Sequence, residues 1–482
     1  MILTSIIAGS SAPTQDRAHE TSFSPSDGAE LFTFAHASMS DVDDAVAAAR
    51  RGMQMPQWSD ITPDRRGELL WRVSTLIEEH AEELAMMDTH DAGMPMGMSK
   101  GVNAPLAAQV FRYYAGFATK IEGRLSQVSI PNTLHYTTRE PIGVCALITP
   151  WNVPLAIAAW KLAPALATGN AVILKPAEQA PWSTWRLVQL CHEAGIPGEV
   201  VQVLFGGPEV GQALVRHRGV DKVSFTGSTE VGCQIVADAA PTLKRVSLEL
   251  GGKAPSIVTA SADMEQAVLG NLRGALFNSG QACGAYTRTF VQRSRADEFA
   301  SRIAEAAKVM RVGVAADEST ELGPLITRGQ VERVLAYIEG AQAEGAELVH
   351  GGRQLRDGGL DHGHFLEPTV FTNVQDHMRI AQEEVFGPVI SILPFDDMDE
   401  AVARANASDY GLAAVVWTKD LVLAHTMAKR LRAGTVFINL LPLIDPGAPW
   451  GGFGLSGWGR EMGAFAIDEF TEPKGVFVGL EA

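Results

Sequence analysis

The sequence predicts an α/β protein built on parallel sheets, and three observations support this fold class. Between residues 141 and 252, short apolar runs such as "VCALIT", "AVILK" and "KVSFTG" alternate with helical segments of roughly ten to fifteen residues. The alternation resumes after residue 253, in strands such as "AAVVWTK" and "GTVFINL". Residues 121–140 instead alternate with a period of about two, which is typical of an extended ribbon. Strands that alternate with helices form a parallel sheet with helices on its faces.

The flanking segments are predicted in chain order. Residues 40–120 are helical, with Ser40 capping a first helix and Thr62, followed by Pro63, capping a second. Pro131 interrupts the 121–140 ribbon, which we expect to leave the main body. The last residues, 463–482, end in a strand that could pair with a neighbouring chain. A ribbon of two strands is marginal in water, so we expect its edge to be covered by a partner.

Composition and charge argue against several classes of protein. The 482 residues include 46% hydrophobic and 20% charged residues, which is typical of a globular chain with more than one domain. A net charge of −17 argues against nucleic acid or an anionic membrane as partner. The four cysteines are far apart, no signal peptide is predicted and no apolar run is long enough to span a membrane, so we expect a cytoplasmic protein. The two histidines of "DHGH", 361–364, have no further ligands at suitable spacing, so no metal site is predicted.

Polar and glycine residues follow the strands of the 141–252 sheet, where each strand ends. Ligands of parallel sheets bind beyond the carboxyl ends of the strands. The residues at these ends are Asn152, Lys175, Glu178, Gly206, Gly207, Gly227, Ser228 and Glu249. The sequence therefore predicts a ligand site along this edge of the sheet.

Cys283, in "FNSGQACGAYTR", is a candidate nucleophile. An isolated cysteine is more often a small buried residue. Here, however, Gly280 and Gly284 leave little bulk around the sulfur, and Asn278 and Arg288 are unusual neighbours for a core position. Taken alone, the stretch leaves both interpretations open.

Three further segments offer the groups that such a nucleophile needs. Glu249 ends an apolar strand and is either a general base with a raised pKa or a salt-bridged structural glutamate. Asn152, between two prolines, offers an uncharged amide donor for an oxyanion, or it is a turn residue. The "GSTEVG" stretch follows a strand and opens a helix, so its amides could face a phosphate.

Together these segments resemble the aldehyde dehydrogenase superfamily of NAD(P)-dependent enzymes, including bacterial phenylacetaldehyde-type members. The motifs "TPWNVP", "LKPAEQAP", "FTGSTEVG", "LELGGK", "FNSGQACGAYTR", "EEVFGPV" and "PWGGFGLSGWGREMG" occur in the family's order and at comparable spacing. The resemblance extends from about residue 40 to about residue 475. It implies a Rossmann-like NAD-binding domain (1–120 and 141–252), an α/β catalytic domain (253–462) and an oligomerisation ribbon (121–140 and 463–482) of a homodimer or homotetramer.

The resemblance also implies the roles of the catalytic residues. Cys283 attacks the aldehyde to form a thiohemiacetal, and Asn152 with the Cys283 backbone amide holds the oxyanion. Hydride transfer leaves a thioester, which water hydrolyses with Glu249 as base. Lys161 and Glu461 match positions proposed to relay protons.

The implied cofactor is NAD. The residues that match cofactor contacts of the family are Thr149, Pro150, Trp151, Lys175, Ala177, Glu178, Gly207, Gly211, Phe225, Gly227, Ser228, Val231, Leu250, Glu384 and Phe386. The Glu178 carboxylate is expected to accept from an adenosine-ribose hydroxyl and to repel a 2′-phosphate, which favours NAD over NADP. Lys175 lies beside Glu178 and could tolerate a phosphate, so the use of NADP remains possible.

The substrate tunnel is expected to be apolar. The loop 439–450, which includes Ile444, matches the family segment that lines the tunnel. Val153, Ala156 and Trp160, on the helix after Asn152, complete the lining. This lining suggests an uncharged aldehyde, either aromatic or medium-chain aliphatic. Val153 and Gly454 depart from the residues usual in the family, which leaves the substrate in doubt. One alternative is a CoA-acylating semialdehyde dehydrogenase, which typically lacks the glutamate base, and another is a non-enzymatic, crystallin-like relative.

Overall fold

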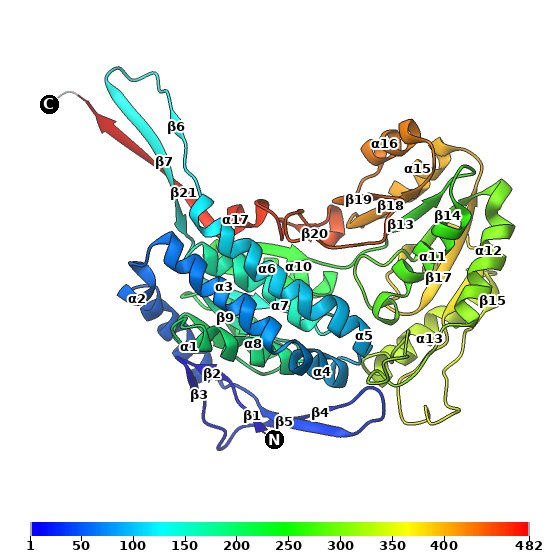
Figure 1. Ribbon diagram of the computed structural model, residues 1–482, viewed down its shortest axis with the longest axis horizontal. Coiled ribbons are helices and arrows are strands. Elements are labelled where there is room, and N and C mark those ends of the chain that lie inside the picture. Colours follow the sequence, from blue (N-terminus) through cyan, green and yellow to red (C-terminus); the bar gives the residue numbers. More distant parts are fainter. Residues whose placement is uncertain (1, 481–482) are drawn as a thin grey trace.

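Two large sheets lie side by side and a ribbon projects from one of them (Figure 1). The structure is a computed structural model that describes residues 2–480. Both large sheets are mostly parallel and carry helices on their faces. The predicted α/β fold with parallel sheets is confirmed. No helix of the described residues is long and apolar enough to cross a membrane.

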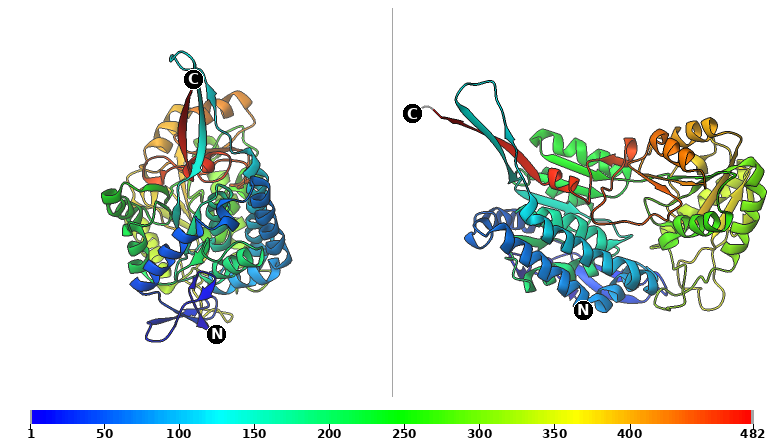
Figure 2. Two further views of the ribbon diagram at one scale, coloured as in Figure 1. Left: turned by 90° about the vertical axis from the view of Figure 1, so that its left-hand side faces the viewer. Right: turned by 45° about the horizontal axis from the view of Figure 1, so that its top comes forward.

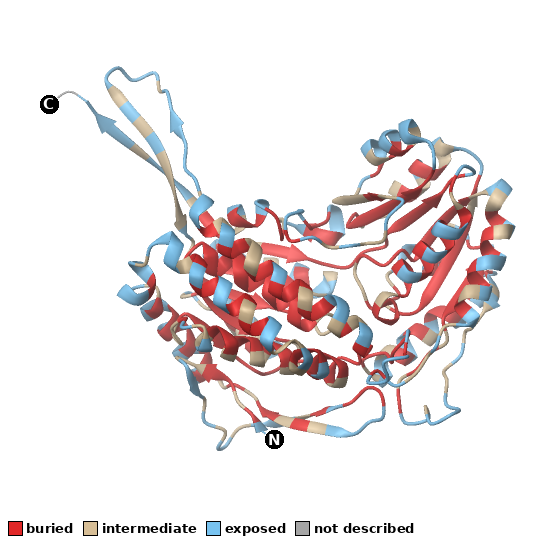
Figure 3. Ribbon diagram, viewed as in Figure 1, coloured by how far each residue is buried: buried red, intermediate tan, exposed pale blue. Residues whose placement is uncertain are grey.

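The first sheet has the strand order β20-β12-β11-β8-β9-β10-β2-β3 among the described residues. Its central strands are parallel and almost wholly buried, because helices cover both of their faces (Figure 3). Their carboxyl ends therefore meet at one edge. The strands are β8 (Val144–Ile148), β9 (Ala171–Lys175), β10 (Val201–Val203), β11 (Lys222–Thr226), β12 (Arg245–Glu249), β20 (Gly457–Trp458), β2 (Ile6–Ile7) and β3 (Ser10–Ser11).

Helices pack on both faces of this sheet. One face carries α1 (Met39–Gly52), α9 (Pro208–Arg216) and α10 (Thr229–Ala239). The other carries α7 (Pro154–Ala167) and α8 (Trp182–Glu193), with α3 (Pro63–Glu79), α4 (Ala81–Asp91) and α6 (Ala104–Phe117) packed outside them. Shorter helical pieces are α2 (Pro56–Ser59), α5 (Met96–Met98), η1 (Ser99–Asn103), η2 (Ala118–Lys120) and η3 (Ala240–Thr242).

Helix starts test two of the predicted caps. Thr62 does cap α3, accepting a hydrogen bond from the Arg65 amide, and Pro63 is its first residue. The predicted cap at Ser40 is wrong, because α1 begins at Met39 and its cap, Ser38, lies two residues before Ser40. Ser38 and Asp41 form a reciprocal capping box, which satisfies two backbone amides instead of one.

The second sheet has the order β15-β16-β17-β14-β13-β18-β19 and, apart from β15, is parallel. Cys283 lies in the connection before β14. The strands are β13 (Pro255–Val258), β14 (Arg288–Gln292), β15 (Glu347–His350), β16 (Thr369–Thr372), β17 (Val389–Phe395), β18 (Ala413–Trp417) and β19 (Thr435–Ile438). The helices are α11 (Met264–Ala275), η4 (Phe277–Gly280), α12 (Arg293–Lys308), α13 (Arg328–Ala343), α14 (Arg379–Gln382), α15 (Met398–Asn406) and α16 (Leu421–Arg430). The chain then returns to the first sheet through η5 (Gly454–Ser456), and α17 (Phe465–Glu469) contacts α7 and β21 there (Figure 1).

The ribbon contains three strands that extend away from the body (Figures 1 and 2). They are β6 (Leu125–Ser126), β7 (Thr133–Pro141) and β21 (Thr471–Gly479). The C-terminal strand β21 pairs antiparallel with β7 of its own chain, so its first partner is internal and not a neighbouring chain. Its other edge forms no strand pair within residues 2–480. Leu125 and Phe477 are exposed on this ribbon.

A small sheet near the N-terminus was not anticipated from the sequence. It contains β1 (Ile2–Leu3), β4 (His19–Phe23) and β5 (Glu30–Ala35) in the order β1-β5-β4. After β5 the chain meets the first sheet, where the Ala37 amide donates to the carbonyl of Phe205 just beyond β10. This hairpin therefore brings residues 19–36 to the edge of the predicted ligand site.

Candidate active site

Cys283 lies in a tight connection between α11 and β14. Asn278 (φ 47°), Ser279 (φ 58°) and Gly280 (φ 75°) are successive left-handed residues, a conformation that is costly for the first two. A Cβ on Gly280 would lie 2.1 Å from the carbonyl oxygen of Gly387, so only glycine fits there. The connection is thus held in one irregular shape, and such strain is typical of functional sites.

The Cys283 loop packs directly on the segment that follows β12. A Cβ on Gly252 would lie 2.3 Å from the Cys283 carbonyl oxygen, which shows how closely the two backbones approach. Gly252 comes three residues after Glu249. The glycines of "LELGGK" therefore let the Cys283 loop pack close to the end of β12, near enough for Glu249 to influence the pKa of the thiol.

Asn152 is buried and fixed to the cysteine loop by two hydrogen bonds. Its Nδ2 donates to the Gln281 carbonyl at 2.8 Å, and its own carbonyl accepts from Asn278 Nδ2 at 2.7 Å. An amide nitrogen has two hydrogens, so one remains for a further acceptor beside Cys283. An uncharged amide held in this way is chemically suited to donate to an oxyanion.

The electrostatics keep the cysteine thiol and the Glu249 carboxyl from ionising readily. Burial, together with the nearby carboxylates of Glu384 and Glu249, raises the pKa of the Cys283 thiol to about 12. Burial and the nearby Glu461 also raise the pKa of Glu249 well above its usual range. Neither carboxyl oxygen of Glu249 accepts a hydrogen bond from any described residue. Glu249 is therefore a buried carboxyl that holds its proton more tightly than usual and that, once ionised, has free lone pairs to accept one.

Lys161 and Glu461 form a fully buried ion pair, although they are 300 positions apart in the sequence. Ser224 of β11 donates to Glu461 Oε1 at 3.2 Å and accepts from Lys161 Nζ at 3.0 Å. Glu461 in turn acts on the pKa of Glu249. Ser224 was not predicted from the sequence. Its one signal was a hydroxyl group in a strand that is wholly buried.

The residues predicted near the nicotinamide end come together around the cysteine loop. Trp151 meets Phe386 edge to face, with ring centroids 5.4 Å apart. Phe386 adopts a left-handed conformation (φ 57°), which turns the chain beside Glu384. The Glu384 carboxylate accepts from the Gly252 amide at 2.9 Å, and burial raises its pKa to about 7.

The turn from β11 to α10 forms an open helix start. Ser228 caps α10 and accepts from the Val231 amide. A Cβ on Gly227 would lie 2.3 Å from the Phe225 ring, so glycine is required where the backbone turns. Leu250 packs against the first turn of the helix, since a Cβ on Gly232 would lie 2.6 Å from its side chain. The exposed amides at this end of the helix suit an anionic group.

The remaining predicted cofactor contacts line the ends of β8, β9 and β10. Thr149 and Pro150 follow β8, and Thr149 carries a buried hydroxyl without a partner among the described residues. Ala177 and Glu178 follow β9, while Gly207 caps α9. Gly211 of α9 lies against the aliphatic part of the Lys175 side chain. Every strand-end residue predicted from the sequence thus lies along one edge of the first sheet.

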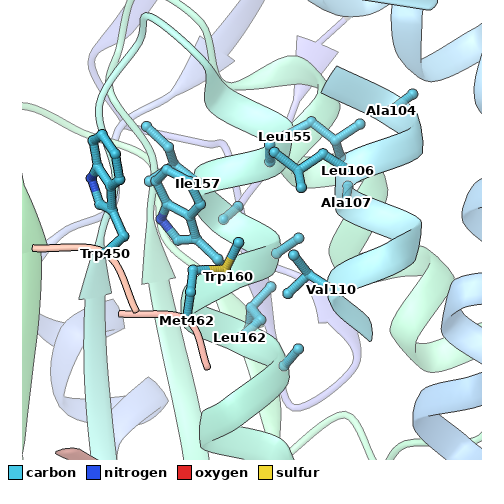
Figure 4. Close-up of a cluster of buried hydrophobic side chains, with 14 of the residues drawn as sticks. Ala104, Leu106, Ala107, Val110, Leu155, Ile157, Trp160, Leu162, Trp450 and Met462 are labelled. Carbon is cyan, nitrogen blue, oxygen red and sulfur yellow. The ribbon is translucent and has the colours of Figure 1, made fainter. Parts of the chain in front are cut away.

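The predicted tunnel residues belong to one apolar cluster. Val153 and Ile444 pack against the core that contains Ala156 and Trp160. Figure 4 shows Trp160 on α7 close to Trp450 and Met462, which belong to the C-terminal part of the chain. The indole of Trp450 reaches to 3.0 Å from a Cβ built on Gly284, next to Cys283. Trp450, the last residue of the loop 439–450 that is predicted to line the tunnel, thus joins the apolar cluster to the cysteine loop.

Comparison with known proteins gives a consistent result. The family model described as "Aldehyde dehydrogenase family" matches residues 12–476. The putative aldehyde dehydrogenase DhaS of Bacillus subtilis is 44% identical over 476 residues, covering 98% of this chain and 95% of that protein. The human mitochondrial aldehyde dehydrogenase is 45% identical, covering 94% of this chain and 87% of that protein.

Solved structures agree with the sequence relatives. An NAD+ complex of aldehyde dehydrogenase from Bacillus cereus superposes with a TM-score of 0.97 at 41% identity, covering 100% of this chain and 97% of that one. A betaine aldehyde dehydrogenase from Staphylococcus aureus has the same TM-score at 38% identity, covering 99% of this chain and 95% of that one. The resemblance inferred from the motifs is confirmed and extends closer to the N-terminus. The chain belongs to the aldehyde dehydrogenase family and is an oxidoreductase that acts on aldehydes.

Proposed function

We propose that this enzyme oxidises an uncharged aldehyde, aromatic or medium-chain aliphatic, to the carboxylic acid with NAD. The observation that carries the mechanism is the convergence of Cys283, Glu249 and Asn152 from three separate segments. Use of NAD follows from family membership and from the NAD+ complexes among the structural relatives.

The residues at the sheet edge fit a dinucleotide. The Thr149 and Thr226 hydroxyls, at the ends of β8 and β11, are buried without a partner among the described residues. The α10 amides begin directly after Gly227, whose lack of a side chain lets an anionic group approach the backbone. When bound, NAD supplies the hydride acceptor. Trp151, Phe386 and Glu384 would hold its nicotinamide end beside Cys283.

The reaction divides into two stages at Cys283. The sulfur would bond to the aldehyde carbon as the thiol proton passes to water, and the second Asn152 hydrogen would stabilise the resulting oxyanion. Collapse of this thiohemiacetal would transfer hydride to bound NAD and leave a thioester. Water then attacks the thioester while Glu249 takes its proton, which yields the acid and restores the thiol. The Lys161–Glu461–Ser224 group, whose Glu461 lies near enough to raise the pKa of Glu249, would relay that proton away from Glu249.

The substrate class rests on the apolar cluster. Val153, Trp160, Trp450 and Ile444 are hydrophobic and lie against one core. They offer no charged group to a substrate, which favours an uncharged aldehyde. Glu249 argues against the CoA-acylating alternative, because a buried carboxyl with a raised pKa is suited to activate water.

We further propose that the three-stranded ribbon joins subunits into a dimer or a dimer of dimers. The outer edge of β21 forms no strand pair within residues 2–480, and Phe477 on this strand is exposed, while Leu125 exposes apolar surface on β6 at the opposite edge of the ribbon. Exposed strand edges of this length are normally covered by a partner.

A screen of aldehydes by NADH absorbance tests the substrate class. Aromatic and medium-chain aliphatic aldehydes should give the highest kcat/KM, while cationic and carboxylated aldehydes should react poorly. Parallel assays with NADP and with CoA serve as controls. Release of an acyl-CoA, or a clear preference for a charged aldehyde, would contradict the proposal.

A further inference from the structure

The adenosine end of the cofactor site has more charged groups than the family motif predicts. Glu20, from β4, and His36, just after β5, join Glu178 there, and their ligand atoms lie within 4.8 Å of one another. Glu209, the second residue of α9, approaches from the other side, with its carboxylate 3.7 Å from His36 Nδ1. Lys175 lies among these carboxylates.

Glu178 and Glu209 face each other across Gly207. A Cβ built on Gly207 would lie 2.8 Å from Glu178 Oε1 and 2.6 Å from Glu209 Oε2. The Gly207 amide donates to the other Glu209 oxygen, Oε1, at 3.2 Å. Both carboxylates are therefore neighbours of the same backbone point, and Glu209 is oriented by a hydrogen bond.

We propose that Glu209 is a second specificity-determining residue, which repels a 2′-phosphate together with Glu178 and so shares in the preference for NAD over NADP. This inference rests on the proposed function, in which Glu178 receives the adenosine ribose. A phosphate placed at the Glu178 carboxylate would lie next to a second negative charge. Like charges at a few ångströms repel appreciably even in a water-like dielectric.

The basic groups of this site do not offset the repulsion. The imidazole of His36 lies between two carboxylates, 3.0 Å from Glu20 Oε2 and 3.7 Å from Glu209 Oε1. The ammonium of Lys175 donates to the Pro176 carbonyl, and it is influenced by Glu178, Glu209 and Glu20 together. A phosphate would therefore have to compete with carboxylates for the His36 imidazole and for the Lys175 ammonium, whereas ribose hydroxyls can donate to the carboxylates.

The test compares two nucleotides that differ only in the 2′-phosphate. Calorimetry should measure the Kd of 5′-AMP and of adenosine 2′,5′-bisphosphate for the unmodified enzyme and for Glu209→Gln. Glutamine keeps the oxygen that accepts from the Gly207 amide and removes the charge. A phosphate carries nearly two negative charges, so the bisphosphate should bind roughly tenfold more tightly to Glu209→Gln. The Kd of 5′-AMP should change by less than about twofold, and kcat/KM should rise for NADP but not for NAD.

Matched variants distinguish the effect of the Glu209 charge from a structural effect at the start of a helix and from the ribose contact of Glu178. Glu265→Gln removes an exposed glutamate at the same second position of α11 and should leave both Kd values unchanged. Glu178→Gln with Glu209→Gln should strengthen bisphosphate binding beyond either single change. Relaxed selectivity in Glu178→Gln without any effect of Glu209→Gln would overturn the inference while the proposed function stands. Equal weakening of both nucleotides by Glu209→Gln would also overturn it, since that result indicates a structural role at the start of α9.

Discussion

Replacing Glu249 by glutamine should separate the two stages of catalysis. In the proposed mechanism, Cys283 acts before hydride transfer, and Glu249 acts mainly after it. In Glu249→Gln the nucleophile and the Asn152 donor remain, so each active site should still release one NADH. The thioester then accumulates, and a slow steady phase follows the burst. Cys283→Ala should abolish the burst and the steady phase together, because no thiohemiacetal can form.

The size of the effect follows from the surroundings of Glu249. Glu249 is 4% exposed, and no described residue donates a hydrogen bond to its carboxyl group. Glutamine therefore removes the base without breaking a hydrogen bond. A positioned general base contributes roughly 10²–10⁴-fold to rate. This corresponds to about 2.7–5.4 kcal/mol in the barrier to deacylation. The burst itself should not slow. The Glu249 carboxylate raises the pKa of the Cys283 thiol, and a neutral glutamine lacks this effect, so the thiol should ionise no less readily in the variant.

Stopped-flow NADH absorbance, with active sites titrated independently, provides the measurement. The expected trace for Glu249→Gln is a burst near one NADH per site and a steady rate lowered by that factor. Loss of burst and turnover together would mean that Glu249 also takes the thiol proton. Full steady-state activity in the variant would remove Glu249 from the mechanism. Thermal melting of both variants checks that neither result comes from unfolding.

Four further outcomes are expected. Glu178→Gln should narrow the gap in kcat/KM between NAD and NADP, and equal efficiency with both cofactors in the unmodified enzyme would contradict the role of Glu178. The pKa of Glu249 is raised, and only its deprotonated form is a base, so the deacylation rate should climb with pH above the usual carboxyl range; an unchanged climb in Glu249→Gln would assign it to another group. Light scattering at micromolar concentration should show a dimer or tetramer, whereas a monomer would argue against the ribbon as an interface. Ser38→Ala should lower the free energy of unfolding by about 1 kcal/mol in denaturant titrations, and an unchanged value would mean that the cap of α1 contributes nothing.

Local patterns in the sequence are enough to predict the architecture and most of the cofactor edge. Period and length distinguish strands from helices, and parallel strands must present their carboxyl ends at one edge. For this reason the pattern alone places Lys175, Gly227 and Glu249 close together. The small residues around Cys283 likewise indicate an open approach to the sulfur. These inferences need only neighbouring residues and one geometric rule about parallel sheets.

Contacts between distant segments, in contrast, follow from the packing of the folded chain. Nothing in the local sequence pairs Lys161 with Glu461 through Ser224, or brings Glu20 and His36 to Glu178, because such contacts depend on how whole elements pack. The partner of β21 was ambiguous for the same reason, since a strand edge accepts any chain that reaches it. The pKa values also belong to the fold. Burial raises those of Cys283 and Glu249, and burial is a property of the packed molecule that no single segment encodes.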